Sequence, residues 1–263
     1  MKKKYLLMMI MPALLFSCAD GGWSSEGSMA SDGGGGQGGS MARFAVSGDN
    51  LYTVDSYTLK VFDISDERKP IYLPSKDQRM NFGVETVFPL DTLLFIGSQD
   101  GLYIYNIVRP EFPQEIAHIM HVTSCDPVVS DGRYAYVTLN TEHVRCGRDI
   151  NQLQVYDLED ITRPKLVNAV SNMYHPRGLG IHGSRLFVCD KGLKIYDLSA
   201  PDNPVWIDDL DKVQGASGID AYDVIPVSEK VLLLIGADGF YQFDISGEKI
   251  TLLSKITVSS PAL

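Results

Sequence analysis

Carboxylate side chains are the groups in this sequence most able to do chemistry. Glu85, Asp126 and Asp220 could form a hydrolytic set, because glycoside hydrolysis uses two carboxylic acids, one as the acid and one as the base or nucleophile. No Gly-x-Ser-x-Gly elbow, P-loop or His-Glu-x-x-His motif accompanies them. The sequence therefore favours a protein without catalytic activity, and a glycoside hydrolase that uses these carboxylates is the alternative.

Histidine and cysteine side chains form a second set that could bind a metal ion. On paper, a zinc site could be assembled from His118, His121, Cys125, His143 and Cys146. Their spacings match no standard zinc motif, because there is no Cys-x₂-Cys pair and no His-x₃-His pair. We therefore expect no metal site and no cofactor.

A five-residue phrase repeats through the chain and would position all of these side chains. It consists of an apolar residue, a variable one, a mostly β-branched one, an aromatic one and then Asp or Asn. The copies occupy residues 59–63, 102–106, 153–157, 193–197 and 240–244, at intervals of about 40 to 50 residues. This order is typical of a strand that runs into a turn capped by the Asp or Asn side chain. No Asp-x-Asp-x-Asp-Gly loop is present, so turn capping explains these carboxylates better than calcium binding does.

Each copy of the phrase belongs to a group of four short strands. An apolar strand precedes it, and pairs such as Asp100-Gly101 and Lys191-Gly192 predict tight hairpins between the two. A third strand lies further upstream, and a fourth follows a proline that comes after the phrase in four of the five copies. Four antiparallel strands per repeat predict a β-propeller. We therefore predict an all-β fold of five four-stranded blades, whose ring could be incomplete or open.

The repeats resemble the LVIVD repeats, a family named for a Leu-Val-Ile-Val-Asp phrase. The phrase, the proline after it and the glycine-containing turns carry the resemblance, which covers roughly residues 41–258. Proteins of that family are bacterial secreted or lipid-anchored propellers, for the most part without an assigned activity. The resemblance therefore implies a fold and a cellular setting but no reaction.

A polar site is predicted where the innermost strands of the blades begin. In a propeller these strands line the central channel, so the residues entering them surround its mouth. Aligning the five strands brings these residues to equivalent places: Arg43, Glu85, Asp126, Gly178 and Tyr222. Four further residues lie close by in the sequence: His175, Arg177, Asp220 and Asp223. We expect a ligand site there, although channel mouths are generally wet and polar.

The first 17 residues have the character of an export signal. Three lysines at residues 2–4 precede an apolar run that is too short to span a bilayer. Residues 15–18, Leu-Phe-Ser-Cys, resemble a bacterial lipobox, in which the cysteine becomes the acylated N-terminus of the mature protein. The resemblance implies a lipoprotein anchored through Cys18, and Ala19 resembles the arrangement that directs lipoproteins to the outer membrane.

Composition divides the chain into three parts. Residues 1–17 form the predicted signal peptide, residues 18–40 the lipidated cysteine and a tether rich in Gly and Ser, and residues 41–263 the propeller domain. The chain has 33 acidic against 23 basic residues, and removal of the signal makes its net charge of −10 more negative still. Nucleic acid is therefore a poor partner.

Three cysteines remain besides Cys18. Cys125 and Cys146 flank a strand of the third repeat, and we interpret them as a disulfide because exported proteins meet oxidising conditions. Two free thiols are the alternative. Cys189 lies within an apolar strand and is interpreted as a small core residue.

Together these features predict a non-catalytic binding or scaffolding module of the cell envelope. We expect it to be held at the bacterial outer membrane, facing the periplasm or the cell surface, and to recognise a protein or a glycan. No clasp strand from the opposite end of the chain is evident. The five blades either close through edge contacts or leave edges that need a partner or a second copy.

Overall fold

The computed structural model describes residues 39–81, 83–120, 127–141 and 150–258 of the chain. These residues belong to one unit, residues 31–263. The predictions made for Cys18, Cys125, Asp126 and Cys146 lie outside the described residues. Within the described ranges, no helix has the length and the apolar character needed to cross a bilayer.

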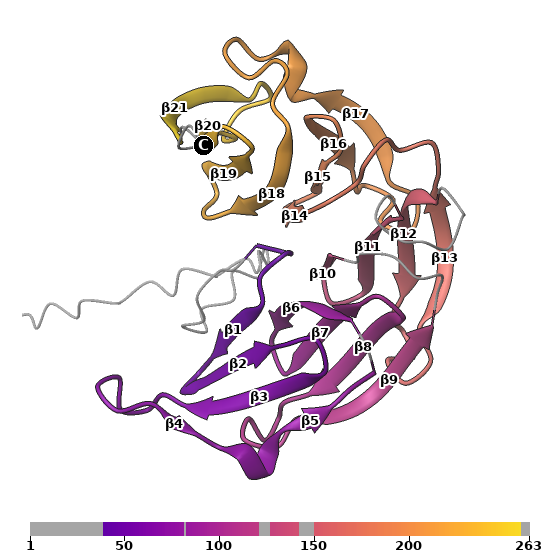
Figure 1. Ribbon diagram of the computed structural model, residues 1–263. Helices are drawn as coiled ribbons and strands as arrows, with labels where there is room; N and C mark the ends of the chain where they lie inside the picture. Colours follow the sequence, from indigo (N-terminus) through magenta and orange to yellow (C-terminus); the bar gives the residue numbers. More distant parts are fainter. Residues whose placement is uncertain (1–38, 82, 121–126, 142–149, 259–263) are drawn as a thin grey trace, which may run out of the picture. The chain divides into compact units, whose positions relative to one another are not determined.

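The structure confirms an all-β propeller of five blades (Figure 1). Blade 1 contains β1 (Phe44–Ser47), β2 (Asn50–Val54), β3 (Thr58–Asp63), β4 (Ile71–Tyr72) and β5 (Gln78–Arg79). Blade 2 contains β6 (Val84–Leu90), β7 (Leu93–Ser98), β8 (Gly101–Asn106) and β9 (Gln114–Met120). Blade 3 contains β10 (Val128–Ser130), β11 (Tyr134–Asn140), β12 (Asn151–Asp157) and β13 (Lys165–Val170).

Blade 4 contains β14 (Leu179–His182), β15 (Arg185–Cys189), β16 (Leu193–Asp197) and β17 (Val205–Asp209). Blade 5 contains β18 (Ala221–Pro226), β19 (Val231–Gly236), β20 (Gly239–Asp244) and β21 (Thr251–Thr257). Blade 1 differs from the other four because its outer strand is split: β4 and β5 both pair with β3, and the short 3₁₀ turn η1 (Pro74–Lys76) separates them. A second 3₁₀ turn, η2 (Leu210–Lys212), follows β17.

The repeated phrase forms the third strand of every blade and ends in a capped turn. In each copy the final Asp or Asn accepts a hydrogen bond from the backbone nitrogen two residues further on, at 2.7 to 3.0 Å. Five residues make this contact: Asp63, Asn106, Asp157, Asp197 and Asp244. The local hydrogen bond explains why Asp or Asn ends the phrase.

Alternation along the phrase sends its residues to opposite faces of a blade. In blade 3, the first and third positions, Leu153 and Val155, pack in one apolar cluster with residues of blade 4. The aromatic fourth position, Tyr156, packs in a different cluster with residues of blade 2. The phrase therefore supplies both of the contacts that a blade makes with its neighbours.

Four clusters of buried apolar side chains lie between consecutive blades. They join blade 1 to blade 2, blade 2 to blade 3, blade 3 to blade 4 and blade 4 to blade 5. The inner strands follow the same order, because β1 contacts β6, β6 contacts β10, β10 contacts β14 and β14 contacts β18. Among the described residues, no fifth cluster joins blade 5 to blade 1.

Candidate functional site

Arg177 and Asp220 form an ion pair between the inner ends of blades 4 and 5. Arg177 precedes β14 and Asp220 precedes β18, so the two inner strands bring them together. Arg177 Nη1 lies 2.8 Å from Asp220 Oδ1, and the guanidinium lies 4.8 Å from the ring centroid of Tyr222. The Asp220 side chain is 57% exposed, so solvent screens this pair and it contributes little to stability. The two side chains nevertheless pair with each other, so neither charge is left to bind a ligand at the channel mouth.

Asp223 is held under the residues that lead into blade 1. The hydroxyl of Ser40 donates to Asp223 Oδ1 at 3.1 Å and accepts a hydrogen bond from the backbone nitrogen of Leu179 at 2.7 Å. The backbone nitrogen of Met41 donates to Asp223 Oδ2 at 3.4 Å. These contacts link the start of blade 1 to blades 4 and 5. We call residues 39–41 with Asp223 the latch.

The latch keeps the Asp223 carboxyl group out of water. Only 7% of the residue is exposed, and this burial raises its pKa to about 6, although hydrogen bonds from Val224, Ser40 and Met41 act in the opposite direction. Gly39 and Gly178 lie against the carboxylate, where a Cβ on either glycine would clash with an oxygen atom. The chain itself therefore fills the space around this group.

The other residues predicted at the mouth are distributed over separate contacts. Glu85 lies in β6 at an irregularity between Val84 and Thr86, and its Oε1 accepts a hydrogen bond from Gln99 Nε2 at 2.7 Å within the same blade. Arg43 is exposed, and its backbone oxygen accepts a hydrogen bond from Val54. Asp126 lies outside the described residues.

His175 is positioned by a buried carboxylate that sequence analysis missed. Asp190, whose side chain is fully buried, accepts hydrogen bonds from the backbone nitrogens of Tyr174 at 2.8 Å and His175 at 2.6 Å. Lys194 Nζ lies 2.6 Å from its other oxygen. A carboxylate with three donors, one of them a lysine, anchors the loop before β14, which is a structural role.

The cysteine and histidine predictions are largely beyond the described residues. Cys125, Cys146, His121 and His143 lie outside them. His118 stacks on Tyr103 with ring centroids 3.9 Å apart. Cys189 is fully buried, and this burial raises its thiol pKa well above the usual range, as expected for a core residue. In the described part of the chain, no group of three or more His, Cys, Asp or Glu side chains is arranged to hold a metal ion.

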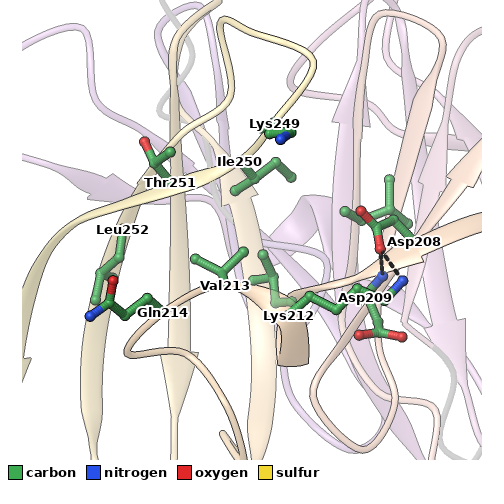
Figure 2. A pocket seen from close by; sticks show the side chains of 11 residues that line it. Asp208, Asp209, Lys212, Val213, Gln214, Lys249, Ile250, Thr251 and Leu252 are labelled. Carbon is green, nitrogen blue, oxygen red and sulfur yellow. Dashed lines mark hydrogen bonds and ion pairs between the residues drawn. The ribbon is translucent and has the colours of Figure 1, made fainter.

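A pocket between the outer parts of blades 4 and 5 was not predicted from the sequence (Figure 2). Its volume is about 690 Å³. One side is formed by β17, η2 and the residues after η2, and the other by the start of β21 and the turn before it. The apolar side chains lining it are aliphatic: Ile195, Leu210, Val213, Ile250 and Leu252.

Charged and polar side chains surround this aliphatic floor. Lys212 Nζ lies 2.6 Å from Asp208 Oδ1, and this contact lowers the pKa of the Asp208 carboxyl group. Asp209 and Lys249 form no ion pair with another described residue, and they lie on opposite sides of the pocket (Figure 2). The pocket therefore offers an apolar floor with charged residues around it. That arrangement suits binding, because it contains no nucleophile paired with a base.

Comparisons with known proteins identify a shared fold. No protein-family model matches the chain, and no curated protein matches it. Among solved structures, the chain is similar to a protein from Lactobacillus plantarum, with a TM-score of 0.58, 15% identity, and coverage of 80% of this chain and 69% of that one. It is similar to apo AztD from Citrobacter koseri, with a TM-score of 0.59, 14% identity, and coverage of 80% and 61%.

A candidate 6-phosphogluconolactonase from Bacteroides fragilis is similar to the same extent, with a TM-score of 0.58, 15% identity, and coverage of 82% of this chain and 69% of that one. The chain thus spans about 61 to 69% of the length of these three structures. At such low identity the likeness shows the propeller fold alone.

Proposed function

We propose that this protein is a non-catalytic binding propeller of the bacterial envelope, anchored by an acylated Cys18. The pocket between blades 4 and 5 is the observation that carries the binding role, because it combines a volume of about 690 Å³ with an aliphatic floor and a charged rim. The lipobox resemblance at residues 15–18 and the LVIVD-like repeats support the envelope setting. Short loops on a rigid sheet scaffold would present the site.

A protein partner suits this pocket better than a glycan. Aromatic faces are the usual apolar platforms for sugar rings, and none of the residues lining the pocket is aromatic. Aliphatic floors accept apolar side chains of a partner, whereas the charged residues around the floor can pair with charges beside such a side chain. We therefore infer that an apolar side chain of an envelope protein enters the pocket, flanked by charged residues.

The test is binding of the full-length protein in detergent to envelope-protein extracts and to a glycan panel. Val213→Asp places a charge in the aliphatic floor, and Val167→Asp is the matched control on the exposed outer strand of blade 3. We expect Val213→Asp to abolish a specific protein signal that Val167→Asp retains. Equal binding by both variants would show that the pocket is not the binding site.

A variant pair at the channel mouth separates this pocket from the site expected there. Arg177→Ala and Asp220→Ala each remove one member of the ion pair between blades 4 and 5. We expect both variants to bind protein normally. If these two variants lose binding and Val213→Asp does not, the binding site lies at the channel mouth.

Glycoside hydrolysis is the alternative function, and among the carboxyl groups of the described residues Asp223 favours it. A carboxyl group with a pKa of about 6 has the character of a general acid. The latch covers this group, so we expect no turnover in a glycoside assay. Turnover that is lost in Asp223→Asn would establish the alternative.

Acylation is tested separately from binding. We expect the full-length protein to partition with membranes and to carry acyl chains, whereas Cys18→Ser should release it without changing its binding. A Cys18→Ser protein that stays on the membrane would contradict the proposed anchor.

A further inference from the structure

Blade 5 has a face that should pack against another blade and does not. In blade 4, this face is formed by Phe187, Cys189, Leu193 and Ile195, all of which are buried against blade 5. Strand register places four residues of blade 5 at the same positions: Leu233, Ile235, Phe240 and Gln242. Phe240 is 45% exposed, and Leu233 and Ile235 are only partly buried. We call these four residues, together with Ile256 beside Phe240, the blade 5 end face.

Blade 1 has the complementary open face. The aromatic fourth position of the phrase is at most 3% exposed in blades 2 to 5, where it packs on the preceding blade. In blade 1 this position is Phe62, which is only partly buried and packs on Tyr72 with ring centroids 4.9 Å apart and the ring planes tilted by 31°. Val46, Leu51 and Phe44 share this side of the sheet by register, and Phe44 is 58% exposed. We call Phe44, Val46, Leu51, Phe62 and Tyr72 the blade 1 end face.

The two end faces are the two halves of one blade interface. Each of the four buried clusters joins a face like that of blade 5 to a face like that of blade 1. The exposure of Phe44 and Phe240 shows that the two end faces of one copy do not bury each other. The latch covers Asp223 and leaves Phe240 exposed.

We propose that the blade 5 end face of one copy packs on the blade 1 end face of a second copy, head to tail. Every copy carries both halves of the interface, so a second copy supplies the same kind of surface that already packs four times within the chain. Polar residues occur on both sides: Gln242 replaces the β-branched residue that is buried in the other blades, and on blade 1 Thr53 lies beside Phe44 and Lys60 lies beside Thr53. Polar residues at these positions suit an interface that separates and reforms. This proposal is independent of the pocket between blades 4 and 5.

A charge exchange tests both the contact and its direction. Phe240→Lys alters the blade 5 end face and Phe44→Glu alters the blade 1 end face. We expect the full-length wild type to sediment as two or more copies. Detergent micelles are kept in excess, so that two copies are not held together only by sharing a micelle. Each variant alone should weaken self-association at least about tenfold, because an unpaired charge would be buried in the contact.

Mixing the two variants should restore association. One contact in the mixed assembly is then the unaltered pair of faces, and another brings the cation of the Phe240→Lys copy against the carboxylate of the Phe44→Glu copy, which attract each other. A contact between two identical faces would not be restored by mixing, so failure of the mixture would overturn the head-to-tail arrangement. Leu166→Lys on the exposed outer strand of blade 3 is the matched control and should associate normally.

The wild-type protein provides a measurement that does not depend on the variants folding. Hydroxyl-radical footprinting reports side-chain exposure at Phe44 and Phe240 as protein concentration rises. We expect both to become protected together, while Leu166 stays reactive. A wild type that remains a single copy at every concentration, or whose association leaves Phe44 and Phe240 equally reactive, would overturn the proposal.

Discussion

Blades 4 and 5 carry the same strand phrase, yet only blade 4 is covered on both faces. In blade 4 the first and third positions are Leu193 and Ile195, which are 1% and 4% exposed. In blade 5 the same positions are Phe240, which is 45% exposed, and Gln242, which is also exposed. The phrase therefore specifies the strand and its turn in both blades. Its third residue is apolar in the blade that packs against another blade and polar in the blade that does not.

The largest expected effect comes from exchanging the third residue between a covered and an uncovered blade. Val155→Gln would place an amide in a fully buried position of blade 3, and we expect a loss of roughly 3 to 5 kcal/mol from unpaired polar burial and overpacking. Gln242→Val should change stability by less than about 1 kcal/mol, because the side chain stays exposed. Chemical denaturation measures both.

A clear gain in stability from Gln242→Val, as expected when a buried amide is replaced by an aliphatic side chain, would mean that blade 5 is covered like blade 3. The claim that the blade 5 end face is exposed while the same face of the interior blades is buried would then be wrong.

The pH dependence of the latch gives the next largest effect. The folded-state pKa of Asp223, about 6, is above its ordinary value of 3.8, so this group favours the folded state below about pH 4 and loses that contribution as pH rises through 6. The difference is at most about 3 kcal/mol, since one pKa unit corresponds to about 1.4 kcal/mol.

Asp223→Asn should remove this part of the profile. We expect the wild type to lose unfolding free energy relative to Asp223→Asn between about pH 4 and pH 6.5, measured by urea denaturation at each pH. Parallel profiles for the two proteins would show that Asp223 is not buried by residues 39–41, and that the inner end of blade 5 is open to solvent.

The hydroxyl of Ser40 should matter less than the carboxylate it contacts. Ser40→Ala removes a donor to Asp223 and the acceptor of the Leu179 backbone N–H, and a typical hydrogen bond contributes about 0.5 to 1.5 kcal/mol net. We expect a loss of about 1 to 2 kcal/mol. Ser217→Ala, at an exposed serine before β18, is the matched control and should be neutral.

The turn carboxylates should give the smallest effect, and the same one in both blades. Asp197 and Asp244 each accept a hydrogen bond from the backbone nitrogen and the hydroxyl of the serine two residues further on. We expect Asp197→Ala and Asp244→Ala to lower the Tm slightly and equally. A much larger drop in blade 4 would show that the covering blade, rather than the local turn, sets the strength of this cap.

Much of the fold follows from the sequence because the phrase reports local structure. Alternation from Leu193 to Asp197 gives the strand, and the Asp gives the turn, so a period of about 40 to 50 residues was sufficient to count the blades. The split outer strand of blade 1 was not predicted, because Pro74 interrupts it only in that copy.

The contacts that join distant parts of the chain could not be predicted in the same way. Ser40 and Asp223 are 183 residues apart, and Ser40 lies in a stretch whose composition indicated a tether. The pocket is lined partly by Leu210 and Val213, which belong to a segment that no other blade repeats, so no pattern marked it. Gln242 was a signal available in the sequence: it is a polar residue where the interior copies have Val or Ile.

Thiol labelling tests the open interface most directly. Gln242→Cys places a thiol on the blade 5 end face, and the buried Cys189 of the same molecule serves as the reference. Peptide mapping after labelling of the folded, dilute protein gives the rate at each position. We expect Cys189 to resist labelling while the thiol introduced at position 242 reacts at nearly the rate of an unfolded chain. If the two thiols label equally slowly in the dilute protein, the blade 5 end face is already covered within one copy and the account is contradicted.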